Sequence, residues 1–253
     1  MSKRKKIFTV VTAVFTALVI LTVAIVGGIF GLFNKGNSLK YSPEQSTQTD
    51  SMLYGKRIIF LGSSVTYGYG ALGDSFVDYL EYQDGVIPIK EAKSGTTLVD
   101  NGKNSYISRM KAIDTATAVD AFVCQLSTND ATKKKPLGKI SDSYSLDDFD
   151  TKTVIGAVEY IICYAKFTWN CPVIFYTNVK YDSDNYAKMV DALNELKSKW
   201  NIDVIDLWNN KSMQNVSDND RKTYMIDEIH PTRRGYREWW TPVIRRQLEK
   251  YIN

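Results

Sequence analysis

Short apolar runs alternate with segments of helical period over most of the chain. The runs cover residues 57–61, 86–91, 121–126, 173–177 and 202–207. Strands that alternate with helices form a parallel sheet with helices on both faces. The pattern therefore predicts an α/β fold, a three-layer α/β/α sandwich with a five-stranded parallel sheet.

The helices between these strands are less sharply bounded. We expect short helices over residues 74–82 and 105–113, and long ones over 151–167, 184–200 and 233–252. Asp150 or Thr151 is expected to cap the third helix, because Asp and Thr side chains accept hydrogen bonds from free amides at a helix start. Pro242 interrupts the last pattern, so we expect that helix to kink or restart there.

The amino terminus follows a different pattern. Residues 1–6 carry four basic side chains and no acidic one, and the next 27 residues, 7–33, carry no charge. About 20 apolar residues span a bilayer. A cleaved signal peptide is the alternative, but its apolar region is shorter and ends in a small-residue site. We expect one transmembrane helix, an uncleaved signal anchor, with the basic segment cytoplasmic and the rest extracytoplasmic.

Two further segments lack a clear period. Residues 34–52 are polar and are expected to form a flexible linker between the membrane and a domain over residues 53–253. Residues 131–150 form a long segment without a clear element, and such loops in compact domains are usually functional or mobile. Because this loop follows the third strand, we expect it to lie over the ligand crevice.

The charge balance argues against a nucleic-acid partner. The chain has 32 basic and 28 acidic residues, and four of the basic ones lie in residues 1–6, which leaves equal numbers in the rest. The pI near 8.7 therefore reflects membrane topology and not a nucleic-acid surface.

The cysteines do not indicate a metal or cofactor site. Cys124, Cys163 and Cys171 fit no metal spacing, and the chain has one histidine. An extracytoplasmic domain permits a disulfide between Cys163 and Cys171; the alternative is that all three are small buried hydrophobic residues. Residues 68–73 match a G-x-G-x-x-G pattern, but too far beyond the strand for a dinucleotide site. We expect no metal and no cofactor.

A candidate nucleophile follows the first strand. The stretch IIFLGSSVTYGYG places Ser64 after a turn at Gly62, at the carboxyl end of a buried strand where α/β proteins bind ligands. The sequence DEIHP near the other end supplies Asp227 and His230. A serine becomes a good nucleophile when a histidine oriented by a carboxylate takes its proton. The alternatives are an ordinary Ser-Ser turn and a structural histidine.

Four short motifs in order resemble the SGNH (GDSL) hydrolase family. They are GSSVTYG with Ser64, SGTT with Gly95, STND with Asn129, and DEIHP with Asp227 and His230. The resemblance covers about residues 55–253. It implies the flavodoxin-like SGNH hydrolase fold and an esterase in which Ser64 attacks, His230 transfers the proton and Asp227 orients the imidazole. It also implies an oxyanion hole formed by the amides of Ser64 and Gly95 and the side chain of Asn129.

Two positions depart from the family pattern. The aspartate of its GDS motif is Ser63 here, and the glycine two residues before Asn129 is Ser127. Neither position supplies a triad or oxyanion group, so we expect activity to be retained. Asp130, beside Asn129, is expected to make structural hydrogen bonds.

Some surface features leave alternatives open. Aromatic side chains either stack on sugar rings or pack the core (Tyr67, Tyr69, Trp208, Trp239 and Trp240). Lysines 133–135 either meet an anionic surface or are simply solvated.

These observations predict a membrane-anchored, extracytoplasmic serine esterase that hydrolyses acyl or acetyl esters. The expected substrate is a small-molecule or glycan ester, with carbohydrate favoured. A lipid acylhydrolase is the alternative within the same class of enzyme. A non-catalytic surface-binding module on the same fold is the alternative from another class.

Overall fold

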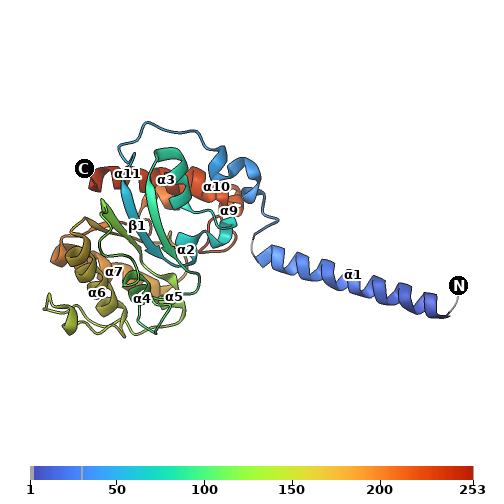
Figure 1. The fold of residues 1–253 in the computed structure, drawn as a ribbon, viewed down its shortest axis with the longest axis horizontal. Helices are drawn as coiled ribbons and strands as arrows, with labels where there is room; N and C mark the ends of the chain where they lie inside the picture. Colours follow the sequence, from blue (N-terminus) through green and yellow to red (C-terminus); the bar gives the residue numbers. More distant parts are fainter. Residues whose placement is uncertain (1–2, 30, 253) are drawn as a thin grey trace.

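The computed structural model describes residues 3–29 and 31–252, and its centre is one parallel sheet (Figure 1). The strands are β1 (Arg57–Gly62), β2 (Ile87–Ala92), β3 (Ala121–Gln125), β4 (Val173–Tyr176) and β5 (Asp203–Ile205). Their order is β2-β1-β3-β4-β5, the flavodoxin-like order of doubly wound folds. The five predicted strands and the predicted α/β class are confirmed.

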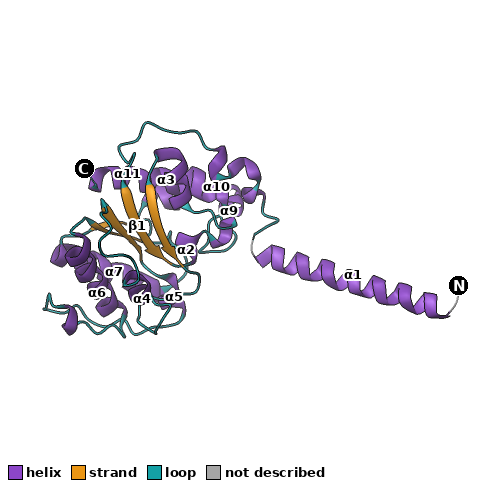
Figure 2. Ribbon diagram, viewed as in Figure 1, coloured by secondary structure: helices purple, strands orange, loops and turns teal. Residues whose placement is uncertain are grey.

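Helices cover both faces of the sheet (Figure 2). One face carries α4 (Tyr106–Met110), α6 (Val154–Trp169) and α7 (Asp184–Trp200). The other carries α3 (Phe76–Asp84) and α11 (Thr241–Tyr251). Alternate side chains of β1 enter the two cores, with Ile59 in the first and Phe60 in the second. The central strands β1, β3 and β4 are therefore buried on both sides, as their apolar runs predict, whereas the edge strand β2 is only partly buried.

Shorter helices complete the chain. They are α2 (Ser64–Tyr67), η4 (Tyr69–Ala71), α5 (Thr128–Thr132), η5 (Leu146–Asp148), α8 (Lys211–Gln214), α9 (Asp218–Tyr224) and α10 (Arg233–Gly235). A π-helical stretch, η6 (Tyr236–Trp240), joins α10 to α11, so the last helix restarts at the predicted Thr241-Pro242 step. The cap of α6 differs from the prediction, since Thr153 and not Asp150 or Thr151 accepts the Gly156 amide.

The amino-terminal residues Lys3–Ile29 form helix α1, which extends away from the domain (Figure 1). In the part of the chain that the structure describes, no helix combines the length and the hydropathy needed to cross a membrane.

The segment that follows α1 differs from the predicted linker. It contains η1 (Lys35–Asn37), η2 (Leu39–Tyr41) and η3 (Pro43–Gln45). The buried Asn37 side chain donates to the carbonyls of Gly31 and Gly70 and accepts from the Arg233 amide. The contacts that attach this segment to the domain are hydrogen bonds from polar side chains and backbone groups. The segment therefore shows no apolar period in the sequence.

The predicted position of the long loop holds only at its start, where Lys133 donates to the Gly95 carbonyl. Lys199, near the end of α7, donates to the carbonyls of Ser141 and Ser143, and Ser141 donates its amide to Glu159 of α6. Both helices run antiparallel to the strands, so the end of α7 lies away from the edge that carries Ser64. The middle of the loop therefore crosses the helices and does not cover the crevice.

The cysteine disulfide left open by the sequence is absent. All three cysteines are free and buried, and the Cys163 thiol donates to the Tyr144 carbonyl. Burial raises the pKa of Cys171 to about 11, which keeps that thiol protonated and unreactive. The cysteines are small packing residues.

Candidate active site

The structure brings Ser64, His230 and Asp227 together in one chain of hydrogen bonds. Ser64 begins α2 directly after β1, and its Oγ lies 2.8 Å from Nε2 of His230. The other ring nitrogen, Nδ1, lies 2.7 Å from Oδ2 of Asp227. A carboxylate only accepts hydrogen bonds, so Nδ1 carries the proton and Nε2 is left to accept from Ser64. This arrangement can remove the serine proton during nucleophilic attack.

The loop that carries Asp227 and His230 is closed on itself. Met225 and Pro231 form an isolated antiparallel bridge, and the Ile226 amide donates to the carbonyl of His230. Gly70 packs against this loop so closely that a larger residue would clash. A Cβ atom at position 70 would lie 2.6 Å from the Pro231 carbonyl oxygen. The Tyr69 ring lies 5.0 Å from the imidazole, centroid to centroid. The position of His230 thus depends on residues that follow the nucleophile turn.

Asp227 is held in its charged form. Its Oδ1 accepts from the backbone amides of Ile229 and His230, both at 2.8 Å. Partial burial raises the pKa of Asp227, but the hydrogen bonds and charge interaction with His230 outweigh it, so the pKa lies below the usual value. A charged Asp227 stabilises an imidazolium at position 230.

The residues expected to form an oxyanion hole lie on the adjoining loops. Within the described residues, the amides of Ser64 and Gly95 donate to no protein acceptor. Gly95 has a φ of +78°, and no atom lies within 4 Å of where its Cβ would be. One Nδ2 hydrogen of Asn129 bonds to the Thr96 carbonyl at 3.0 Å. That bond ties Asn129 to the Gly95 loop and leaves its second amide hydrogen available.

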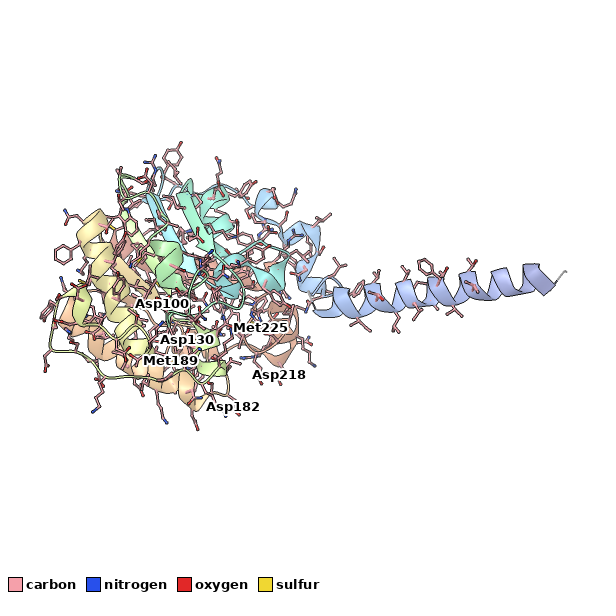
Figure 3. All side chains as sticks on the ribbon, turned by 60° about the horizontal axis from the view of Figure 1, so that its bottom comes forward. Asp100, Asp130, Asp182, Met189, Asp218 and Met225 are labelled. Atoms are coloured by element: carbon pink, nitrogen blue, oxygen red, sulfur yellow. The ribbon has the colours of Figure 1, made fainter. Side chains whose placement is uncertain are left out.

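Asp130 makes the predicted structural bonds. Its carboxylate accepts from the amides of Leu98 and Val99, at 2.8 and 3.1 Å. Burial raises the pKa of Asp130 despite these bonds. Asp130, labelled in Figure 3, is fully buried and joins α5 to the loop that contains Gly95.

Two cavities adjoin these residues. One of about 420 Å³ lies between residues 93–96 and 101–104, beside Gly95. The other, of about 400 Å³, is lined by Asp227 and by residues of α9 and the turn after it. Met225 and Asp218, labelled in Figure 3, belong to this second cavity. Among the described residues, no group of three or more His, Cys, Asp or Glu side chains could hold a metal ion.

The comparison with family models decides the classification. The model of the GDSL-like lipase/acylhydrolase family matches residues 60–238. The chain belongs to this family. It is therefore an SGNH-type hydrolase of ester bonds.

Solved structures share the fold of this GDSL-like hydrolase at low sequence identity. A protein from Lactobacillus plantarum is 20% identical with a TM-score of 0.62, covering 79% of this chain and 97% of that one. A lipolytic protein of the G-D-S-L family from Veillonella parvula is 18% identical, with a TM-score of 0.53 and coverage of 77% and 96%. An acetyl xylan esterase is 17% identical, with a TM-score of 0.51 and coverage of 76% and 98%. No curated protein matches the sequence.

In this GDSL-like hydrolase Ser63, which stands where the family motif has aspartate, bonds to Gln125. The Oε1 atom of Gln125, at the end of β3, accepts from the Ser63 amide at 2.8 Å and the Ser63 hydroxyl at 3.2 Å. It also accepts from the Thr66 hydroxyl at 2.9 Å. Gln125 is buried and fixes the turn that presents the nucleophile. Gln125 lies in none of the four motifs. The only sequence feature that points to it is that a polar residue ends an apolar strand.

Arg109 of α4 is a second residue that sequence analysis missed. Its buried guanidinium donates to the carbonyls of Gly62 and Glu91, both at 2.8 Å, and to the Thr96 hydroxyl at 3.1 Å. It also pairs with the Glu91 carboxylate at 3.2 Å. Arg109 therefore connects the nucleophile turn to the loop that contains Gly95.

The aromatic residues divide between the two alternatives. Trp208, Trp239 and Trp240 are buried in the cores, whereas Tyr67 is exposed and Tyr69 is partly exposed beside His230. Tyr69, whose ring lies against the imidazole, is therefore the aromatic residue placed to meet a ligand at this site.

Proposed function

We propose that this GDSL-like hydrolase is a serine esterase in which Ser64, His230 and Asp227 form the catalytic triad. The observation that carries the proposal is the continuous hydrogen-bonded chain from Ser64 Oγ to the Asp227 carboxylate, at 2.8 and 2.7 Å. A structural histidine would not need a nucleophile on one ring nitrogen and a carboxylate on the other. The amides of Ser64 and Gly95 and the side chain of Asn129 form the oxyanion hole.

The reaction then follows from the geometry. Ser64 Oγ attacks the ester carbonyl carbon while its proton moves to Nε2 of His230. The tetrahedral oxyanion collapses, the ester C–O bond breaks, and the imidazolium gives its proton to the departing alcohol. Water, deprotonated by His230, then hydrolyses the acyl-serine and releases the acid. Each oxyanion donor contributes roughly 3 to 4 kcal/mol to the barrier reduction.

For the substrate we propose an acyl or acetyl ester on a carbohydrate. The acetyl xylan esterase among the similar structures supports this class. So do the polar residues around Gly95, which include Ser94, Asn101 and Asn104. A lipid acylhydrolase would need an apolar groove at the same place.

Hydrolysis of p-nitrophenyl acetate, butyrate and octanoate by the full chain tests the reaction and the acyl preference. We expect acetate to be preferred and Ser64→Ala and His230→Ala to lower kcat by about 10⁴-fold or more. Ser198→Ala, an exposed serine on α7, is the matched control. A preference for octanoate would assign the enzyme to lipids. Equal rates in wild type and both site variants would reject the triad.

Labelling by a fluorophosphonate probe separates an esterase from a binding module. The probe reacts with an activated serine, so we expect labelling of the wild type and of Ser198→Ala but not of Ser64→Ala. A folded wild type that does not react would favour the non-catalytic module.

We also propose, from the sequence alone, that residues 7–33 anchor the enzyme in the cell membrane with the domain extracytoplasmic. The support is the run of 27 uncharged residues after a basic segment. Expressed in cells, the full chain should stay with membranes after a carbonate wash, and external protease should digest the domain. Release into the soluble fraction by carbonate would reject the anchor.

A further inference from the structure

The cavity beside Gly95 is bordered by lysines. Lys93 and Lys103 line this cavity. Lys133, which follows α5, donates to the carbonyl of the lining residue Gly95 at 2.6 Å. The Lys93 ammonium donates to the Asn104 side-chain oxygen at 2.7 Å. Both of these acceptors, a backbone carbonyl and a side-chain amide oxygen, are neutral. Within the described part of the chain, none of these three ammonium groups lies within 4.0 Å of a carboxylate.

These lysines lie together in a domain that carries no net charge. Residues 7–253 contain equal numbers of basic and acidic side chains, so positive charge gathered at one place is not a property of the whole surface. Arg109 beneath the cavity does have a carboxylate partner, Glu91. Lys93, Lys103 and Lys133 have no such partner within 4.0 Å among the described residues.

The position of this charge relative to the reaction is specific. Gly95 is one of the proposed oxyanion donors. The space that its missing side chain would occupy is free of other protein atoms. A substrate whose carbonyl lies at Ser64 and Gly95 would extend part of its structure into the cavity between Lys93 and Lys103. Lysine ammonium groups bind phosphate, sulfate and carboxylate as point charges.

We propose that the natural substrate is an anionic ester, with a phosphate, sulfate or carboxylate bound by Lys93, Lys103 and Lys133 beside the reacting carbonyl. The inference rests on the proposed esterase function and narrows its substrate class. An acylated acidic carbohydrate has this chemistry. The anionic group belongs either to the acyl part or to the alcohol part of the ester, and the two are tested separately.

The test compares each anionic ester with a neutral one of similar shape. For the acyl part, the pair is the mono-4-nitrophenyl ester of adipic acid and its methyl ester. For the alcohol part, the pair is 4-acetoxybenzenesulfonate and 4-acetoxybenzenesulfonamide. The full chain in detergent is assayed at low salt and again at about 0.5 M salt, where the Debye length falls to only a few Å.

At low salt we expect kcat/KM for the anionic member of one pair to exceed that of its neutral partner at least tenfold. High salt should remove most of this preference. The double variant Lys93→Gln/Lys103→Gln should lower the ratio at least fivefold, and Lys93→Glu/Lys103→Glu should lower it further. Lys188→Gln, an exposed lysine on α7, should leave the ratio unchanged. Lys133 is kept because it also contacts Gly95.

A ratio near one for both pairs, or one that the lysine variants do not change, overturns the anionic substrate while leaving the esterase intact. Absence of Ser64-dependent turnover of all four esters overturns the esterase and this inference together. Thermal melting of each variant shows that a changed ratio does not come from unfolding.

Discussion

At the scale of single residues, the reacting groups are held by partners that lie outside every motif. Gln125 accepts three hydrogen bonds from the nucleophile turn, and Arg109 bonds to both that turn and the Gly95 loop. Preorganised donors lower the barrier only when their supports are rigid. The absence of aspartate at position 63 is thus accompanied by a buried amide that binds Ser63 directly.

Substitution of Arg109 tests this support. Arg109→Lys keeps the charge but loses the planar fork that reaches two carbonyls and a hydroxyl. We expect kcat for p-nitrophenyl acetate to fall about 10- to 100-fold, with a smaller change in KM, because the oxyanion donors shift relative to Ser64. Arg246→Lys, an exposed position on α11, is the matched control. A fall in thermal stability with unchanged kcat would show that Arg109 is only structural.

Asp227 gives a pH prediction. Its pKa in the folded enzyme lies below the value of about 3.9 for an unfolded aspartate, so its charged form stabilises the fold. That stabilisation is fully present above about pH 4 to 5 and is lost as pH falls through the folded pKa. We expect the difference in unfolding free energy between wild type and Asp227→Asn to shrink from pH 6 to pH 2.5. Urea unfolding at each pH measures this difference in free energy. Asp191→Asn, at an exposed position on α7, is the control.

A difference between wild type and Asp227→Asn that stays constant over this pH range would contradict the charged-state stabilisation. It would mean that the carboxylate gains nothing from His230 in the folded state.

At the scale of elements, the apolar runs were sufficient to locate the strands. Burial of β1 and β3 on both faces makes their interior positions apolar, so each run ends within one residue of its strand. The sequence identifies Ser64 because it follows a strand end and His230 because it is the sole histidine, whereas Gly95 and Asn129 come from the resemblance to the SGNH family. Arg109 and Gln125 were missed because their roles depend on contacts between segments distant in sequence.

The segment after α1 was missed for a related reason. Its three short helices bury little apolar surface, and the contact with the domain is made by the polar Asn37. A polar segment without an apolar period predicts a linker when the hydrogen-bond partners of its side chains are not known. Because Asn37 bonds to Gly70 and Arg233, this element supports both sides of the His230 loop.

Asn37→Ala tests whether this segment belongs to the domain. The change leaves two carbonyls and one amide without their partner, and each buried unsatisfied group costs about 1 to 3 kcal/mol. We expect a loss of about 2 to 4 kcal/mol in unfolding free energy and a lower kcat, measured by urea unfolding and p-nitrophenyl acetate hydrolysis. Lys35→Ala, exposed in the same helix η1, should change neither. If the two variants had the same unfolding free energy and the same kcat, the interpretation of this segment as a flexible linker would be supported.

At the scale of the whole molecule, the middle of the loop over residues 131–150 attaches two helices to each other and lies away from the edge that carries Ser64. The Lys199 ammonium lies 2.6 Å from the Glu159 carboxylate, which is fully buried and also accepts from Trp200. The same ammonium binds the Ser141 and Ser143 carbonyls and lies over the rings of Tyr144 and Trp200. One buried ion pair therefore joins α6, α7 and the loop.

Glu159→Gln tests this role of the loop. Removing one charge of a buried pair leaves the other uncompensated and costs about 3 to 5 kcal/mol. We expect a loss of that size in unfolding free energy and faster hydrogen exchange at residues 141–144. The double variant Glu159→Gln/Lys199→Met should recover part of the stability because it leaves no unpaired charge. Under conditions where the variant stays folded, kcat should remain within about twofold of wild type, since Ser64 lies at the opposite edge of the sheet. A large loss of kcat with unchanged stability would instead make the loop a lid that moves over the site.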